Sequence, residues 1–512
     1  MWALVPPPNL TVLGLAIALV VFLKYALRFN IHPQEPPVVY PRIPLVGHII
    51  GMLTAGATYF GELYEMHGYP IFTLPMFTGR TYIVTSPELA SAVQKAPSSL
   101  ELDPIFEEIV PRLAVLNRHT TLIMRGTAAG RKEGVSINKL SHKILTWQSI
   151  SRGSHAQLGF LGELINNVED YRDVDLFRFV RETVCEASNR TFFGPQNPFE
   201  KDPSLLDSFW DWENGLTVLM MGIFPSITAR KSYRGFMRCA RAFAAYIEAG
   251  GYENAHEIVQ ARNEMHLQHG IFDVLERGKL DVAMQLATNV NASIITFWLL
   301  SNVFSRPDLL ARLRDEITEN ALVGPATLSL EFLRQSCPTL VSVFREILRL
   351  YAPLSSVRYI GADTMLANTY LVKKGAIIQV AGSVMHKDKS HWGPDAASFN
   401  PDRFLYSTSG TRVGSDGRVS EDKSSNLHPA TFRSFGGGTS MCPGRNFAQA
   451  EILSLSAVLL LGFDMKAHDE LAWNPPPDTK RPLISAMKPV KEVKVTIRRR
   501  KEFKGVKWEL KL

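Results

Sequence analysis

Ten residues near the C-terminus, from Phe435 to Gly444, join a glycine-rich turn to a cysteine that precedes an apolar helix. The segment reads Phe-Gly-Gly-Gly-Thr-Ser-Met-Cys-Pro-Gly, and the residues from Arg445 to Leu461 are predicted to be helical. Glycine lets the backbone turn and approach another group where a side chain would block it. The dipole at the start of the helix favours a negative sulfur at Cys442. The chain is therefore predicted to fold a tight loop around this sulfur, at the beginning of a helix.

Two interpretations of Cys442 are open from the residues alone. An isolated cysteine is most often a small, buried, apolar residue. A thiolate that binds ferric iron instead needs hydrogen-bond donors beside it and protection from water. The amides of the glycine turn can supply the donors, and Phe435 can shield the sulfur. The whole pattern favours Cys442 as the axial ligand of a haem iron, with Phe435, Gly438 and Gly444 helping to bind the cofactor.

The pattern Phe-x-x-Gly-x-x-x-Cys-x-Gly resembles the haem-ligand loop of the cytochrome P450 superfamily, and three further features agree with that family. Glu346–Arg349 resembles its Glu-x-x-Arg pair, and Pro401–Phe404 resembles its Pro-x-Arg-Phe segment. A long helix that ends at Pro307 resembles the helix that crosses above the haem. The resemblance covers nearly the whole chain. It implies haem b (iron protoporphyrin IX) as cofactor and a monooxygenase similar to microsomal, fungal-type biosynthetic members.

The periodicity predicts a mainly α protein, in which small β elements accompany one large helical domain. The composition, 46% hydrophobic and 21% charged, is that of a globular protein, and the pattern from about Ser86 to Leu350 is mostly helical. A helix from Asp281 to Phe304 would be about 35 Å long, and another is predicted from Pro338 to Tyr351. Short strands are predicted at Ile71–Leu74, Thr81–Val84, Tyr370–Val372 and Ala376–Val380.

The N-terminus predicts a membrane anchor followed by a stiff connector. Residues 10–23 are apolar and uncharged, and Lys24 can extend to the membrane surface, so residues 1–30 are assigned as a transmembrane anchor. A cleaved signal peptide is the alternative, but positive charge follows the apolar run instead of preceding it. That charge places the remainder on the cytoplasmic side, and the resemblance implies the endoplasmic reticulum. Prolines make residues 31–45 a hinge before a catalytic domain of residues 46–512.

The charge and the cysteine content exclude other classes of protein. The net charge is +7, but no long basic run is interleaved with aromatic residues, so no nucleic-acid partner is expected. The positive net charge would instead favour binding to an anionic membrane or to an acidic surface of another protein. The four cysteines are too scattered for a zinc site or a disulfide scaffold, which fits a reducing compartment.

Glu346 and Arg349 are spaced by three residues and share one face of a helix. An exposed ion pair at this spacing would contribute little to stability. A buried pair with Arg403 as a third member would instead hold the helix against the haem loop. The family resemblance favours the buried network, and its role is predicted to be structural.

The resemblance implies that Arg358 binds a haem propionate, since a guanidinium pairs well with a carboxylate. A solvated arginine is the alternative. The family usually carries an arginine or histidine two residues before the ligand cysteine, where this chain has Ser440. Part of the propionate binding must therefore come from elsewhere. His386 and Arg433 are candidates, and either can instead belong to the scaffold.

The long helix departs from the family pattern at Asn291. The family usually has an acid followed by threonine at this point, and this chain has Val290 and Asn291. An asparagine at this position is similar to one branch of the family. That branch contains cholesterol 7α-hydroxylase, which is an oxygenase, and prostacyclin synthase, which is an isomerase. Asn291 is therefore the candidate catalytic residue for proton delivery. The alternative is that its amide only satisfies the backbone of a kinked helix.

The favoured function is an O₂-dependent monooxygenase acting on a bulky apolar substrate such as a terpenoid, a steroid or another secondary metabolite. No dinucleotide fingerprint is present, so NADPH is expected to act through a separate cytochrome P450 reductase, with cytochrome b5 as a second candidate donor. An O₂-independent isomerase or dehydratase is the alternative enzyme, and a non-catalytic haem-binding protein is a third interpretation. The expected substrate contacts are apolar: Ala287, Ile294, Ile295, Leu354, Leu483 and Ile484.

Overall fold

The computed structural model describes residues 31–43, 46–76, 79–96, 98–126, 143–406 and 427–512, together with Leu13, Gly14 and Ile17. Apart from those three residues, the predicted anchor lies outside the described part, as do Pro44 and Leu45 of the predicted hinge. Within the described residues, no helix has the length and apolar character needed to cross a membrane.

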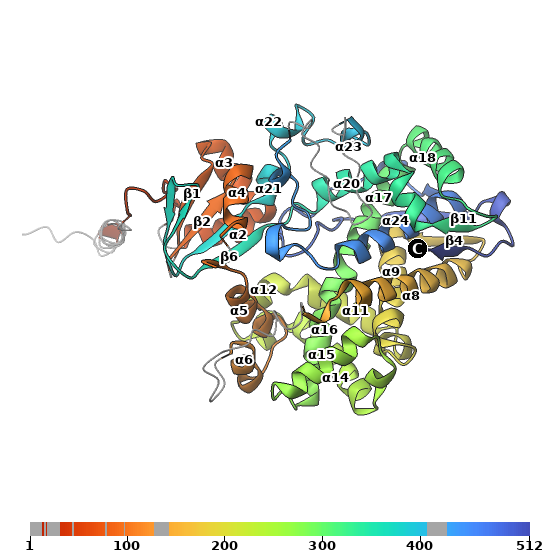
Figure 1. Ribbon diagram of the computed structural model, residues 1–512, viewed down its shortest axis with the longest axis horizontal. Coiled ribbons are helices and arrows are strands. Elements are labelled where there is room, and N and C mark those ends of the chain that lie inside the picture. Colours follow the sequence, from red (N-terminus) through yellow and green to blue (C-terminus); the bar gives the residue numbers. More distant parts are fainter. Residues whose placement is uncertain are drawn as a thin grey trace, which may run out of the picture.

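Most of the described chain is helical, which confirms the predicted fold class (Figure 1). Helices α17, α20 and α24 lie at the centre, with α14 and α15 on one side of them and a sheet at one end. The helices of six or more residues are α2 (Gly47–Ala55), α3 (Tyr59–His67), α4 (Pro87–Gln94), α5 (Asp103–Leu113), α6 (Arg118–Met124), α8 (Trp147–Asn166), α9 (Leu176–Phe193), α11 (Leu205–Asn214), α14 (Arg230–Glu248), α15 (Glu257–Gln268), α16 (Val274–Gln285), α17 (Asn291–Phe304), α18 (Pro307–Asn320), α19 (Leu330–Gln335), α20 (Pro338–Tyr351) and α24 (Arg445–Gly462). The short α12 (Leu216–Met220) follows α11.

Within the described residues, the strands form one sheet of five strands and three smaller sheets. The largest has the order β1-β2-β9-β6-β3 and carries Arg358 on β6. The strands are β1 (Ile71–Met76), β2 (Gly79–Val84), β3 (Leu100–Glu101), β4 (Tyr171–Asp175), β5 (Thr327–Ser329), β6 (Ser356–Ile360), β7 (Thr364–Leu366), β8 (Tyr370–Val372), β9 (Ile377–Val380), β10 (Phe463–Ala467), β11 (Lys494–Arg499) and β12 (Glu509–Lys511). The predicted strands are present, but β8 pairs with β7 and not with β9.

The long central helix starts earlier than predicted and contains a change of pitch. Asp273 caps its start by accepting hydrogen bonds from two backbone N–H groups, so the helix begins at Val274 and not at Asp281. A π-turn over Leu286–Val290 then joins α16 to α17. Such turns are rare and occur often at functional sites. Every residue of α17 after Asn291 is buried, because α9, α20 and α24 pack around it.

Candidate active site

The loop from Phe435 to Gly444 is built by glycines with unusual backbone angles. Gly436 and Gly438 have φ values of +75° and +62°, a conformation that favours glycine. At Gly437 an added Cβ would lie 2.0 Å from the terminal amide of Gln94, so that side chain on α4 would have to move. The N–H of Cys442 donates to the carbonyl of Phe435, 2.9 Å away, which closes the loop directly before α24.

The sulfur of Cys442 lies at the N-terminus of α24 and retains accessible surface. Burial raises the pKa of its thiol, whereas the N–H of Gly444 and the charge of Arg445 lower it. An added Cβ at Gly444 would lie 3.9 Å from the sulfur, so Gly444 borders the sulfur directly. Phe435 is half-buried against the main core. A bound metal ion would replace the thiol proton, because a coordinating thiol is deprotonated.

Two buried arginines lie beside this loop without a carboxylate partner among the described residues. Arg358 donates to its neighbouring carbonyl, Val357 O, at 2.7 Å and to the hydroxyl of Ser440. Arg433 donates to Ser356, and its Nε has no partner in the described structure. Burial, and then the charge of Arg358, lower the pKa of Arg433 to about 10. Two adjacent unneutralised guanidinium groups form a site suited to carboxylates.

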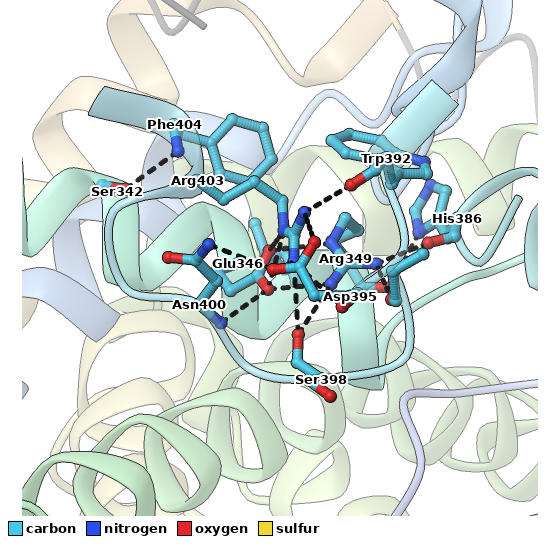
Figure 2. A network of polar contacts seen from close by, with 12 residues as sticks. Ser342, Glu346, Arg349, His386, Trp392, Asp395, Ser398, Asn400, Arg403 and Phe404 are labelled. Atoms are coloured by element: carbon cyan, nitrogen blue, oxygen red, sulfur yellow. Dashed lines mark hydrogen bonds and ion pairs between the residues drawn. The ribbon is translucent and has the colours of Figure 1, made fainter. Parts of the chain in front are cut away.

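Glu346, Arg349 and Arg403 form the predicted contacts (Figure 2). The carboxylate of Glu346 accepts from Nε and Nη2 of Arg349 at 2.7 and 2.8 Å, and from Nε of Arg403 at 3.1 Å. The side chains of Glu346 and Arg349 are 0% exposed, and that of Arg403 is 9% exposed. The backbone N–H of Asn400 also donates to Glu346. The charges are therefore withdrawn from water and satisfied within the protein.

His386 connects this network to the cysteine loop. Arg349 donates to the carbonyl of His386 at 2.6 Å, and burial lowers the pKa of the imidazole to about 3, so the ring is neutral. Nε2 accepts from the backbone N–H of Arg433 at 2.8 Å, and Nδ1 therefore carries the proton donated to Arg349 O. Ser434 adds a second link by donating to Leu348 O. His386 is thus part of the scaffold, whereas the side chain of Arg433 contacts only neutral groups, Ser356 and the side-chain amide of Gln94, and keeps an unpartnered Nε in the described structure.

Asn291 is half-buried at the junction of the π-turn and α17. Its Oδ1 accepts from the backbone N–H of Ala486 at 2.9 Å. The bond is to an amide of a distant segment, and not to the backbone of its own helix. The same bond fixes the oxygen toward Ala486, and Nδ2 has no hydrogen-bond partner in the described chain. Asn291 can therefore offer two N–H donors to a ligand.

The predicted substrate contacts separate into two groups. Ile294 and Ile295 are 0% and 1% exposed, covered by protein atoms in the main core. We therefore correct their assignment from substrate contacts to core residues. Ala287 is exposed within the π-turn. Leu354, Leu483 and Ile484 retain accessible surface, and the last two lie in the segment that bonds Asn291 through Ala486.

Comparisons with known proteins assign the chain to a family. Residues 36–497 match the family described as Cytochrome P450, so the chain belongs to the cytochrome P450 family, and it is a cytochrome P450 monooxygenase. The cytochrome P450 monooxygenase nodJ of Hypoxylon pulicicidum is 30% identical over 505 residues, covering 96% of this chain and 95% of that protein. A cytochrome P450 monooxygenase of Gibberella zeae is 28% identical, with coverage of 97% and 95%.

Cholesterol 7-alpha-monooxygenase of Cricetulus griseus is 25% identical over 340 residues, which cover 62% of this chain and 64% of that protein. Membership of the family implies a haem-thiolate cofactor. The residues present fit that group: an accessible thiol at a helix N-terminus, and two guanidinium groups that lack acidic partners.

Replacing both arginines, Arg358→Leu with Arg433→Leu, is expected to weaken haem retention at least tenfold, because charge-assisted bonds to the two propionates would be lost. Each single variant is expected to lose less. The measurement is transfer of haem from purified protein to an excess of apomyoglobin, followed by absorbance. Arg152→Leu, which removes an exposed partner of Glu257, is the control. Equal transfer rates in the double variant and the wild type would contradict the assignment.

Proposed function

We propose that this monooxygenase oxidises a bulky apolar molecule, such as a terpenoid, a steroid or another fungal secondary metabolite. The observation that supports this substrate class is the segment bonded to Asn291, because it presents Leu483 and Ile484 with accessible apolar surface. Relatives from several fungi carry the name cytochrome P450 monooxygenase. Electrons come from NADPH through a separate cytochrome P450 reductase, with cytochrome b5 as a second donor.

The cofactor would be haem b, bound by Cys442 as its axial ligand and by Arg358 and Arg433 at its propionates. When bound, a haem with a cysteinate ligand supplies the activation of O₂ and favours cleavage of the O–O bond. The chain itself supplies the sulfur at a helix N-terminus, the loop amides and the donors of Asn291. The network around Glu346 keeps α20 and the cysteine loop in place.

Asn291 is proposed to hold water that delivers protons during oxygen activation. Asn291→Ala should retain haem but form product roughly ten- to a thousandfold more slowly, about 1–4 kcal/mol in the barrier. NADPH electrons should then leak to hydrogen peroxide. Asn291→Asp is the sharper variant, because a carboxylate can still accept from Ala486 but offers no N–H donor. Product, NADPH and peroxide are measured together for all three proteins.

Unchanged turnover and coupling in both variants would reduce Asn291 to a scaffold residue. Loss in Asn291→Ala with full activity in Asn291→Asp would show that only the Ala486 bond is needed. The alternative function, an isomerase or dehydratase acting on a preoxidised substrate, rests on the asparagine itself. It predicts wild-type turnover without NADPH or O₂, and no leakage to peroxide in either variant.

We also propose that residues 1–30 anchor the protein once in the endoplasmic reticulum membrane, with residues 46–512 as a cytoplasmic catalytic domain. The basis is the apolar run at residues 10–23 followed by Lys24 and Arg28. Full-length protein in microsomes should resist extraction by alkaline carbonate, dissolve in detergent and remain open to added protease. Protection of the catalytic domain in sealed microsomes would contradict this topology.

A further inference from the structure

A fully buried carboxylate lies outside the haem and proton-delivery sites. Glu213, near the C-terminal end of α11, has a side chain that is 0% exposed. Its carboxylate accepts from the guanidinium of Arg481, from the ammonium of Lys488 and from the hydroxyl of Ser485. Its backbone carbonyl accepts from Nη2 of Arg481 at 2.7 Å. A buried charge needs such partners, and here all of them come from a single segment near the C-terminus.

That segment is the loop of a small hairpin, residues 479–487, which we call the 479–487 loop. Backbone bonds from Asp478 to Lys488 and from Val490 to Pro476 close its base. Arg481 lies near the start of the loop and Lys488 directly follows its last residue, so Glu213 contacts the chain near both ends of the loop. Neither cation has another carboxylate partner in the described chain.

The opposite side of the 479–487 loop is bonded to the central helices. Ala486 donates its N–H to Asn291, and Trp298 donates its indole N–H to Met487 O at 2.7 Å. The N–H of Met487 donates to Tyr351 O at 2.8 Å, which ties the loop to the end of α20. The loop is therefore bonded to α11 through Glu213, and to α17 and α20 through these three hydrogen bonds. Leu483 and Ile484 lie in the same loop, between Arg481 and Ser485, which both bond to Glu213.

We propose that Glu213 is a positioning residue that sets the selectivity of the active site. By holding both ends of the 479–487 loop, it fixes Leu483 and Ile484 against the substrate and keeps the Ala486 N–H on Asn291. The inference rests on the proposed function and deepens it, because Glu213 would shape the proposed substrate site through the 479–487 loop without contacting the substrate. Neutralising Glu213 would leave Arg481 and Lys488 without their counter-charge, and the loop would be held less firmly to α11, where the bond from Arg481 to the Glu213 carbonyl remains.

The test compares Glu213→Gln, which preserves shape, with Ser485→Ala, which removes one donor, and with the matched control Glu276→Gln. Glu276 is also a buried carboxylate, and it pairs with Lys279 and the backbone of Asn117, away from the loop. The first measurement is amide hydrogen exchange of peptides that cover residues 479–488. Exchange in Glu213→Gln should become about ten- to a hundredfold faster, because buried donors lose a charged acceptor.

The second measurement uses two probes whose imidazole nitrogen binds haem iron, imidazole itself and the bulkier 4-phenylimidazole, titrated by absorbance. Imidazole affinity should stay within about twofold in every variant. The ratio of 4-phenylimidazole to imidazole affinity should change at least about fivefold in Glu213→Gln and in the same direction, but less, in Ser485→Ala. A purely structural role would change both affinities in parallel.

Wild-type exchange in the 479–488 peptides of Glu213→Gln would overturn the proposal. Faster exchange with an unchanged affinity ratio would also overturn it, because the loop would then move without shaping the pocket. A change of the same size in Glu276→Gln would show a general effect of removing a buried charge, and it too would contradict a specific role. If the wild-type protein binds neither probe, the proposed haem-based function fails. The exchange measurement does not depend on haem ligands, so it still tests separately whether Glu213 holds the loop.

Discussion

The Cys442→Ala variant is expected to lose the red-shifted Soret band that a reduced, CO-bound haem-thiolate protein shows, together with all NADPH-dependent turnover. No other cysteine can replace the ligand. Cys185, Cys239 and Cys337 are buried in the helical body, and burial raises the pKa of Cys239 and of Cys337 to about 12. Only Cys442 combines accessible surface with a helix N-terminus and a glycine loop.

The measurement is the difference spectrum of the reduced protein with and without CO. Cys337→Ala is the control and should retain the band, because Cys337 lies in the core beside Glu316. A thiolate band that persists in Cys442→Ala would contradict the assignment of the iron ligand and the account built on it.

Glu346→Ala is expected to lower the free energy of unfolding by about 3–5 kcal/mol, because it leaves two buried guanidinium groups without their shared carboxylate. Loss of Glu346 should also reduce haem content, since Arg349 is joined through His386 to the backbone of Arg433 in the cysteine loop. Urea unfolding followed by fluorescence gives the stability, and absorbance gives the haem content per chain.

Glu257→Ala is the matched control for this prediction. It removes an acid whose ion pair with Arg152 is exposed, so a change below about 1 kcal/mol is expected. Similar unfolding free energies for Glu346→Ala and Glu257→Ala would show that the buried network does not stabilise the fold.

The parts of the fold that follow from local signals agree with the sequence. Helix α20 starts at Pro338 and ends at Tyr351 because proline suits the first helical turn and Pro353 follows the end. Helix α24 begins at Arg445 as predicted and continues to Gly462. The predicted family membership is also confirmed. It could be predicted because the motifs that carry it are short runs of neighbouring residues.

The features that the sequence did not reveal depend on contacts between distant residues. Asn291 and Ala486 are 195 positions apart, and Glu213 and Arg481 are 268 apart. No periodicity predicts such pairs, because each arises only when helices and loops pack. The π-turn also lacks a proline or glycine that would have marked it. The position of Arg433 near Arg358 was indicated in part by Ser440. Because Ser440 stands where the family usually has an arginine or histidine, a second cation had to come from elsewhere in the chain.

Burial explains the error in the predicted pocket. Ile294, Ile295 and Asn291 lie within two turns of one helix, but that helix is surrounded by others after its first residue. Helical spacing shows which residues share a face and does not show whether that face contacts a ligand or another helix. The predicted contacts that retain accessible surface are Ala287 in the π-turn and three residues of loops, Leu354, Leu483 and Ile484.

The most direct test of the proposed function, NADPH-dependent oxidation of a bulky apolar substrate, is isotope labelling with ¹⁸O₂. Full-length protein in membranes is incubated with cytochrome P450 reductase, NADPH and a panel of terpenoids and sterols under ¹⁸O₂, and the products are analysed by mass spectrometry. A converted substrate should gain one ¹⁸O atom per hydroxylation, only when NADPH is present and Cys442 is intact. Conversion of a preoxidised substrate without NADPH, or a product that carries no ¹⁸O under these conditions, would contradict it.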